Sequence, residues 1–155
     1  MDETQAAARA ESIPAPLWGI ALTALAPFPA AGVAYAYGPP HLMRPALTII
    51  LAWSAVVLSF LGGVRWGLET REPAPRWQRQ VFSFLAAVAG AVILLTRGRV
   101  PDTWIVGGFI TAFMIQWLFD HQTPNTPSRY PVLSTAVTTA ACASLAMVLE
   151  RALHS

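Results

Sequence analysis

The chain has no lysine, a single cysteine and little charge of either sign. Only 12% of its 155 residues are charged, about half the share found in soluble domains, so there is too little polar surface to cover a water-soluble globule. The lone Cys142 excludes an intrachain disulfide and a thiolate metal site. All ten basic residues are arginines without a basic run, which argues against a nucleic-acid partner. These absences indicate an integral membrane protein in a lipid bilayer.

Motifs that carry chemistry are equally scarce. The three histidines, His41, His121 and His154, fall in predicted loops or the tail, without the spacing of metal ligands. Haem ligation inside the bilayer is therefore not expected. The sequence has no phosphate-binding loop, no Gly-x-Ser-x-Gly and no zinc motif. We predict a protein that is not an enzyme and needs no cofactor or metal.

Hydrophobic residues make up 55% of the chain and gather in long blocks. A helix that crosses the hydrocarbon needs about 20 apolar residues, and five segments reach or approach this length. The runs are continuous and do not alternate at period two, which favours helices over barrel strands. The prediction is an all-α bundle of five transmembrane helices at 17–37, 46–68, 81–96, 103–119 and 132–149, between tails at 1–16 and 151–155.

The predicted connections are short and rich in proline and polar residues, as expected between helices. Five crossings would place the two termini on opposite sides of the membrane. The side of the N-terminus then carries six arginines, with Arg65 included, and the other side carries four. Arginine-rich loops favour the cytoplasm, so we predict a cytoplasmic N-terminus and a periplasmic C-terminus. The arginine-only, alanine-rich composition is typical of a GC-rich bacterial genome, and we expect the bacterial inner membrane.

Small residues recur at every fourth position of the second predicted helix. They are Ala55, Ser59, Gly63 and Gly67, and we call them the small-residue stripe. This spacing keeps them near one face, where another helix backbone can approach closely. The approaching helix belongs either to this chain or to a partner, although small residues are also simply common in membrane helices. We expect the stripe to be a packing surface.

Arg65 follows the apolar run of the same helix. It lies two residues from both Gly63 and Gly67, hence about 200° around the helix from each, and so points away from the stripe. Glu69 shares the face of Arg65 one turn later. Because residues 46–64 already supply a membrane-length run, the sequence favours Arg65 as an anchor that reaches the headgroups. A buried charge on an ion pathway is the alternative.

Gln116 and Asp120 share a face near the end of the fourth predicted helix. An amide and a carboxylate at this spacing can bind a proton or an ion, or they can cap the helix and hydrogen-bond a neighbour. The second use is favoured, because Asp120 opens a polar loop and is expected to be hydrated. If the second and fourth helices end on the same side, an Arg65–Asp120 ion pair is geometrically allowed.

Three segments carry a resemblance: LSFLGGVRWGLE at 58–69, LTALAPFPAAGVAY at 22–35 and FMIQWLFD at 113–120. Together they resemble an uncharacterised family of small membrane proteins, a domain of unknown function that includes transmembrane protein 69. Gln116 and Asp120 match the family's Gln-Tyr-x-x-Asp pattern, with Trp117 in place of tyrosine, whereas the third predicted helix lacks the expected proline and tryptophan. The resemblance implies a multi-pass helical fold in a bacterial inner or mitochondrial membrane, and it implies no activity.

Two functional hypotheses follow from these features. In the first, the protein is a structural or accessory subunit that packs against a larger membrane complex, or against itself, through the small-residue stripe. In the second, it transports or binds a small solute, an ion or a lipophilic ligand, with the polar candidates Arg65, Glu69, Gln116 and Asp120 as its site. A stoichiometric membrane partner after mild solubilisation would favour the first, and solute movement by the partner-free protein would favour the second.

Overall fold

The computed structural model describes residues 19, 22–71, 76–122 and 130–154. Among these residues it contains five α-helices: α3 (Pro27–Tyr37), α4 (Pro40–Glu69), α5 (Trp77–Leu95), α6 (Asp102–Gln122) and α7 (Tyr130–Leu153). The predicted tail at 1–16 and the start of the first predicted span lie outside the described residues.

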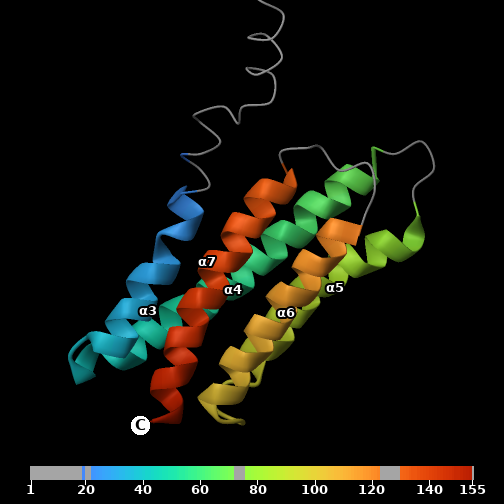
Figure 1. The fold of residues 1–155 in the computed structure, drawn as a ribbon. Helices are drawn as coiled ribbons and strands as arrows, with labels where there is room; N and C mark the ends of the chain where they lie inside the picture. Colours follow the sequence, from blue (N-terminus) through green and yellow to red (C-terminus); the bar gives the residue numbers. More distant parts are fainter. Residues whose placement is uncertain (1–18, 20–21, 72–75, 123–129, 155) are drawn as a thin grey trace, which may run out of the picture.

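The helices run up and down along the long axis of one bundle (Figure 1). The C-terminal ends of α4 and α6 and the starts of α5 and α7 lie at one end, whereas the α3–α4 and α5–α6 turns and the C-terminal end of α7 lie at the other (Figure 1). Helix α4 contacts all four other helices, and α7 packs between α3 and α6. Because α4 and α6 point the same way, their C-terminal ends meet at one end of the bundle.

Four of these helices are long and apolar enough to cross a membrane: Pro40–Glu69, Trp77–Leu95, Asp102–Gln122 and Val132–Leu153. The predicted all-helical, multi-pass membrane protein is therefore confirmed with four candidate spans. The span predicted at 17–37 stays a prediction, because its described part holds the 11-residue α3 and a short helical stretch at 22–25.

The helices extend beyond the apolar runs from which they were predicted. Helix α4 begins at Pro40, six residues before the predicted start, and Pro45 lies inside it. A proline in the first turn costs no hydrogen bond, because that N–H has no intrahelical acceptor, and Pro45 interrupts only the following turn. Backbone hydrogen bonding thus continues through the polar residues at both ends of α4.

The core is built mainly by α3, α4, α6 and α7. Phe28 of α3 meets Phe113 of α6 edge to face, with ring centroids 6.1 Å apart, and both side chains are fully buried. Helix α5 instead buries small residues, which are Ser83, Ala86 and Gly90. Small side chains let its backbone come close to that of α4.

Candidate functional site

Arg65 lies inside the bundle. Its side chain is only 4% exposed, and its Nε atom is 3.4 Å from Oδ1 of Asp120 on α6. Its guanidinium carbon also lies 5.0 Å from the centre of the Phe119 ring, a cation–π arrangement. A buried guanidinium is costly unless a counter-charge and hydrogen bonds compensate it, so the surroundings of Asp120 decide whether this arrangement is stable.

Asp120 is fully buried and accepts hydrogen bonds from three side chains besides its ion pair. Gln116 Nε2 donates to Oδ1 at 3.1 Å. Ser134 Oγ donates to Oδ2 at 2.7 Å, and the Tyr130 hydroxyl donates to the same oxygen at 3.2 Å. We call Arg65, Gln116, Asp120, Tyr130 and Ser134 the Arg65–Asp120 cluster. It joins α4, α6 and α7 near the end of the bundle where α4 and α6 finish.

Helical spacing explains how the sequence builds this cluster. Gln116 and Asp120 are one turn apart on α6, as are Tyr130 and Ser134 on α7, and side chains at this spacing face the same way. Tyr130 is the first residue of α7, and Asp120 lies two residues before the end of α6. The first two turns of α7 therefore lie beside the carboxylate and supply both hydroxyl donors.

The electrostatics of the cluster keep its donors protonated. Tyr130 precedes the candidate span of α7, and burial, followed by the neighbouring Asp120 carboxylate, raises its pKa well above the ordinary value. The phenol therefore stays a hydrogen-bond donor at neutral pH. With a guanidinium, an amide and two hydroxyls directed at one carboxylate, the cluster fastens three helices together, and its hydrogen bonds are charge-assisted.

Comparison with known proteins places the chain in a family. The model of a family described as protein of unknown function, DUF3429, matches residues 13–150. The chain belongs to the DUF3429 family. No curated protein and no solved structure matches it. The match includes all three segments that carried the resemblance in the sequence, and with it Arg65, Gln116 and Asp120.

For this DUF3429 protein, the prediction that the Arg65 side chain reaches outward to the headgroups is wrong, because the side chain is buried and turns inward to Asp120. The predicted helix at 46–68 already contained Arg65, but the sequence did not show that Asp120 of α6 faces this position. The expectation that Asp120 is hydrated is also wrong, because its side chain has no exposed surface. The Arg65–Asp120 pair that the predicted topology allowed is present in the structure.

Glu69 is buried, but it does not join the Arg65–Asp120 cluster. Its Oε1 accepts the backbone N–H of Arg76 at 2.9 Å, and its Oε2 lies 3.6 Å from Nη1 of Arg79. Both arginines follow the α4–α5 connection, so Glu69 ties the end of α4 to the start of α5. The sequence placed Glu69 on the face of Arg65, but it could not show which arginine Glu69 would meet.

The structure divides the small-residue stripe into two parts. Ala55 packs against α5, where a Cβ built on Gly90 would lie 3.3 Å from the Ala55 Cα, and Ser59 donates to the Ala55 carbonyl at 2.8 Å. Gly63 and Gly67 are exposed, and a Cβ built on either meets nothing within 4 Å in the described part of the chain. Ala55 thus packs within the chain, and Gly63 and Gly67 face outward.

Sequence reasoning missed Tyr130, Ser134 and Gly62 as residues that organise the site. Gly62, which neighbours the stripe, brings α4 against α5: a Cβ there would collide with the Ser83 carbonyl oxygen. The signal for Tyr130 and Ser134 is their shared spacing with Gln116 and Asp120, but only the folded chain brings the two pairs together.

Proposed function

We propose that this DUF3429 protein is a non-catalytic accessory subunit that packs against a larger membrane complex, or against a second copy, through the outer face of α4. The observation that carries the proposal is the exposure of Gly63 and Gly67, which have open space where a side chain would stand. Exposed glycines one turn apart let a second helix approach closely, and such packing drives association in lipid. Phe60 on the same helix is 63% exposed and adds apolar contact area.

The buried ion pair supports this proposal, because it determines how α4 is rotated. Arg65 points inward to Asp120 at 3.4 Å, and Gly63 and Gly67 lie about 200° around the helix from it. With Arg65 held inside, the two glycines are held outside. In the proposed function, the Arg65–Asp120 cluster is thus a structural device that presents the glycine face.

The finer assignments belong to the same proposal. We place five spans in a bacterial inner membrane, with the N-terminus in the cytoplasm and the C-terminus in the periplasm, and we place transmembrane protein 69 in the same family. Burial of Arg65 removes it from the count of interfacial arginines, which becomes five on the N-terminal side against four on the other. Reporter fusions at both termini and between α6 and α7, at 123–129, would test the orientation.

We expect Gly63→Leu to abolish the association, because the new side chain fills the space that a partner helix would occupy. The wild-type chain, purified in mild detergent, should run as a homodimer or with one stoichiometric membrane partner, measured by size exclusion with light scattering. Gly63→Leu should run as the monomer with unchanged helicity by circular dichroism. The matched control is Gly107→Leu on α6, which is also a helical glycine with open space at its Cβ and should leave the association intact.

Cross-linking gives the association a second readout. A Gly67→Cys variant in a Cys142→Ser background has one thiol, on the proposed contact face. We expect this variant to cross-link in native membranes, either to a second copy of itself or to a single other protein. Two results together would overturn the accessory function. The wild-type chain would be monomeric and without a partner, and the Gly67→Cys variant would form no cross-linked adduct.

A second candidate function, ligand binding, is favoured by one groove. A cavity of about 310 Å³ opens between α4, α5 and α6, where Ala86, Gly108 and Ala112 leave room. Gln116 and Phe119 form part of its wall. Gln116 belongs to the Arg65–Asp120 cluster, and the Phe119 ring lies against the Arg65 guanidinium. A lipophilic molecule in this groove would thus lie beside the buried charges.

The ligand-binding candidate predicts activity from the isolated chain. Partner-free protein in liposomes should move an ion or small solute, and Ala112→Phe, which fills the groove, should reduce the initial rate at least tenfold. Val92→Phe is the control, because Val92 is exposed on the outside of α5 and does not line the groove. Equal rates in empty liposomes and in liposomes with the protein would reject transport through this groove and leave the accessory function untouched.

A further inference from the structure

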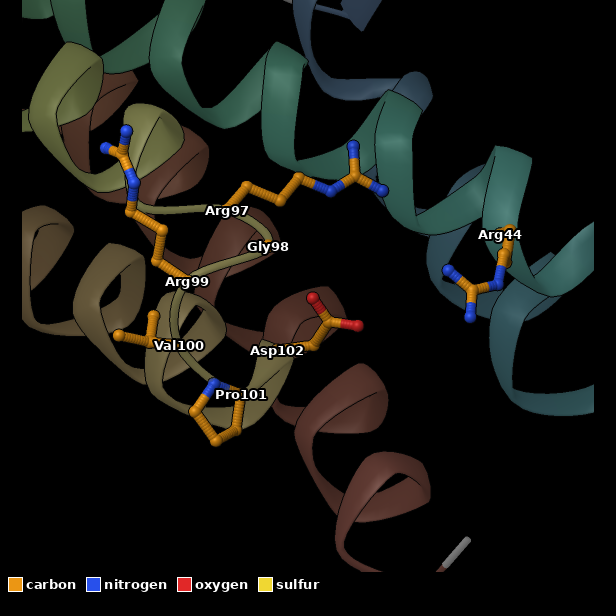
Figure 2. Close-up of a pocket in the computed structure, with 7 residues that line it drawn as sticks. All are labelled: Arg44, Arg97, Gly98, Arg99, Val100, Pro101 and Asp102. Atoms are coloured by element: carbon orange, nitrogen blue, oxygen red, sulfur yellow. The ribbon is translucent and has the colours of Figure 1, made fainter.

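A basic cleft lies at the end of the bundle opposite to the Arg65–Asp120 cluster. Its volume is about 350 Å³, and it is lined by Arg44 of α4, by the turn at 97–101 between α5 and α6, and by Asp102 at the start of α6. Figure 2 shows the side chains of Arg44, Arg97 and Asp102 directed toward one shared space. The guanidinium of Arg99 points away from that space (Figure 2).

The cleft lies where lipid headgroups are expected. Helix α4 has 30 residues, which corresponds to about 45 Å of helix against about 30 Å of hydrocarbon. Arg44 is the fifth residue of this helix, and Arg97 follows the end of the candidate span Trp77–Leu95. We therefore place both guanidiniums at the level of the membrane surface.

Arg44 and Arg97 reach the cleft from different parts of the chain. Arg97 Nη2 donates to Thr48 Oγ1 at 2.8 Å, one helical turn from Arg44, and Gly98 makes the turn possible with a φ of 82°, which favours glycine. Within the described residues, the Arg44 side chain has no carboxylate within 4.0 Å. The facing groups are two guanidiniums and the Asp102 carboxylate, so the space between them has a net positive charge.

We propose that the cleft between Arg44 and Arg97 binds a phosphate group, supplied by the headgroup of an anionic phospholipid. A planar guanidinium matches two phosphate oxygens at once, and two guanidiniums from separate elements can hold one phosphate from both sides. The first turn of α6, beside the cleft, adds backbone N–H groups that favour an anion. Asp102 accepts hydrogen bonds from headgroup hydroxyls, which favours phosphatidylglycerol over a bare phosphate.

The experiment measures lipid binding to the full chain in dodecyl maltoside. The probes are dioleoyl phosphatidylglycerol, dioleoyl phosphatidylcholine and inorganic phosphate, with bound lipid counted by native mass spectrometry. We expect phosphatidylglycerol to bind at least fivefold more tightly than phosphatidylcholine, and Arg44→Gln and Arg97→Gln each to weaken its binding about three- to tenfold. Arg97→Gln also loses the bond to Thr48, so Arg44→Gln keeps the test valid if Arg97→Gln fails to fold.

Arg99→Gln is the matched control, because it removes the same charge from the same turn but from a guanidinium that points away from the cleft (Figure 2). It should leave phosphatidylglycerol binding within about twofold of wild type. Equal losses in Arg99→Gln and Arg44→Gln would mean diffuse attraction to the basic end and would overturn the site. Millimolar inorganic phosphate that displaces phosphatidylglycerol from the wild type but not from Arg44→Gln would support the phosphate site. This result would identify free phosphate as its ligand.

Discussion

Asp120→Leu is expected to destabilise the bundle by about 3–5 kcal/mol, the usual cost of breaking a buried ion pair by removing one partner. The variant leaves the Arg65 guanidinium, which is 4% exposed, without its carboxylate, and it removes the acceptor for Gln116, Tyr130 and Ser134. The double variant Arg65→Met/Asp120→Leu should regain a large part of this loss, because no buried charge remains. Unfolding in detergent, followed by circular dichroism, measures both.

A double-mutant cycle makes this prediction specific to the pair. Neighbours that interact directly are coupled by about 0.5–3 kcal/mol, so the losses of Arg65→Met and Asp120→Leu should not add. The control is Asp102→Asn, which changes an exposed carboxylate at the start of the same helix and should cost about 1 kcal/mol or less. Strict additivity of the two single variants would show that the ion pair contributes nothing to stability.

Gly62→Ala and Gly63→Ala are expected to change stability in opposite directions, although the two glycines are adjacent on α4. Replacing glycine with alanine in a helix raises the free energy of unfolding by about 1 kcal/mol. At Gly63 the new methyl group would meet no atom of the described residues within 4 Å, so Gly63→Ala should stabilise the protein. At Gly62 the methyl group would collide with the backbone carbonyl of Ser83 and lie 3.1 Å from the Ala86 Cβ. Gly62→Ala should therefore destabilise by about 1–3 kcal/mol.

The same unfolding experiment measures both glycine variants, with each serving as the control for the other. A carbonyl oxygen belongs to the backbone of α5 and cannot turn aside as a flexible side chain can, so relief requires α4 and α5 to separate. Gly90→Ala, where the nearest atom is the Ala55 Cα at 3.3 Å, should show an intermediate loss. A Gly62→Ala protein as stable as wild type would mean that α4 and α5 do not pack as described.

These two predictions concern two sides of one helix. Arg65 points to α6 through Asp120, Gly62 faces α5, and Gly63 and Gly67 face outward. The inward contacts determine the rotation of α4, and the outward face is what remains for a partner. A variant that releases Arg65 should therefore also weaken the proposed association, even though Arg65 is remote from the contact.

The membrane class, the helical fold and the approximate positions of four spans could be predicted from the sequence. Lipid imposes a minimum length of apolar residues on each helix and requires backbone hydrogen bonds to be satisfied within it, and both are local properties. The positions of Gln116 and Asp120 on one face of α6 followed from helical spacing alone. The possibility of an Arg65–Asp120 pair followed from counting crossings, since α4 and α6 had to end on the same side.

The tertiary structure alone decided depth, rotation and partners. Arg65 was predicted to reach outward to the headgroups, because its position at the end of an apolar run does not show which neighbour it faces, and in the structure it faces Asp120 of α6. The stripe was predicted as one packing surface, yet Ala55 meets Gly90 within the chain while Gly63 and Gly67 face outward. Which face of α4 meets a neighbour depends on the summed contacts of four other helices, and no spacing within one helix contains that information.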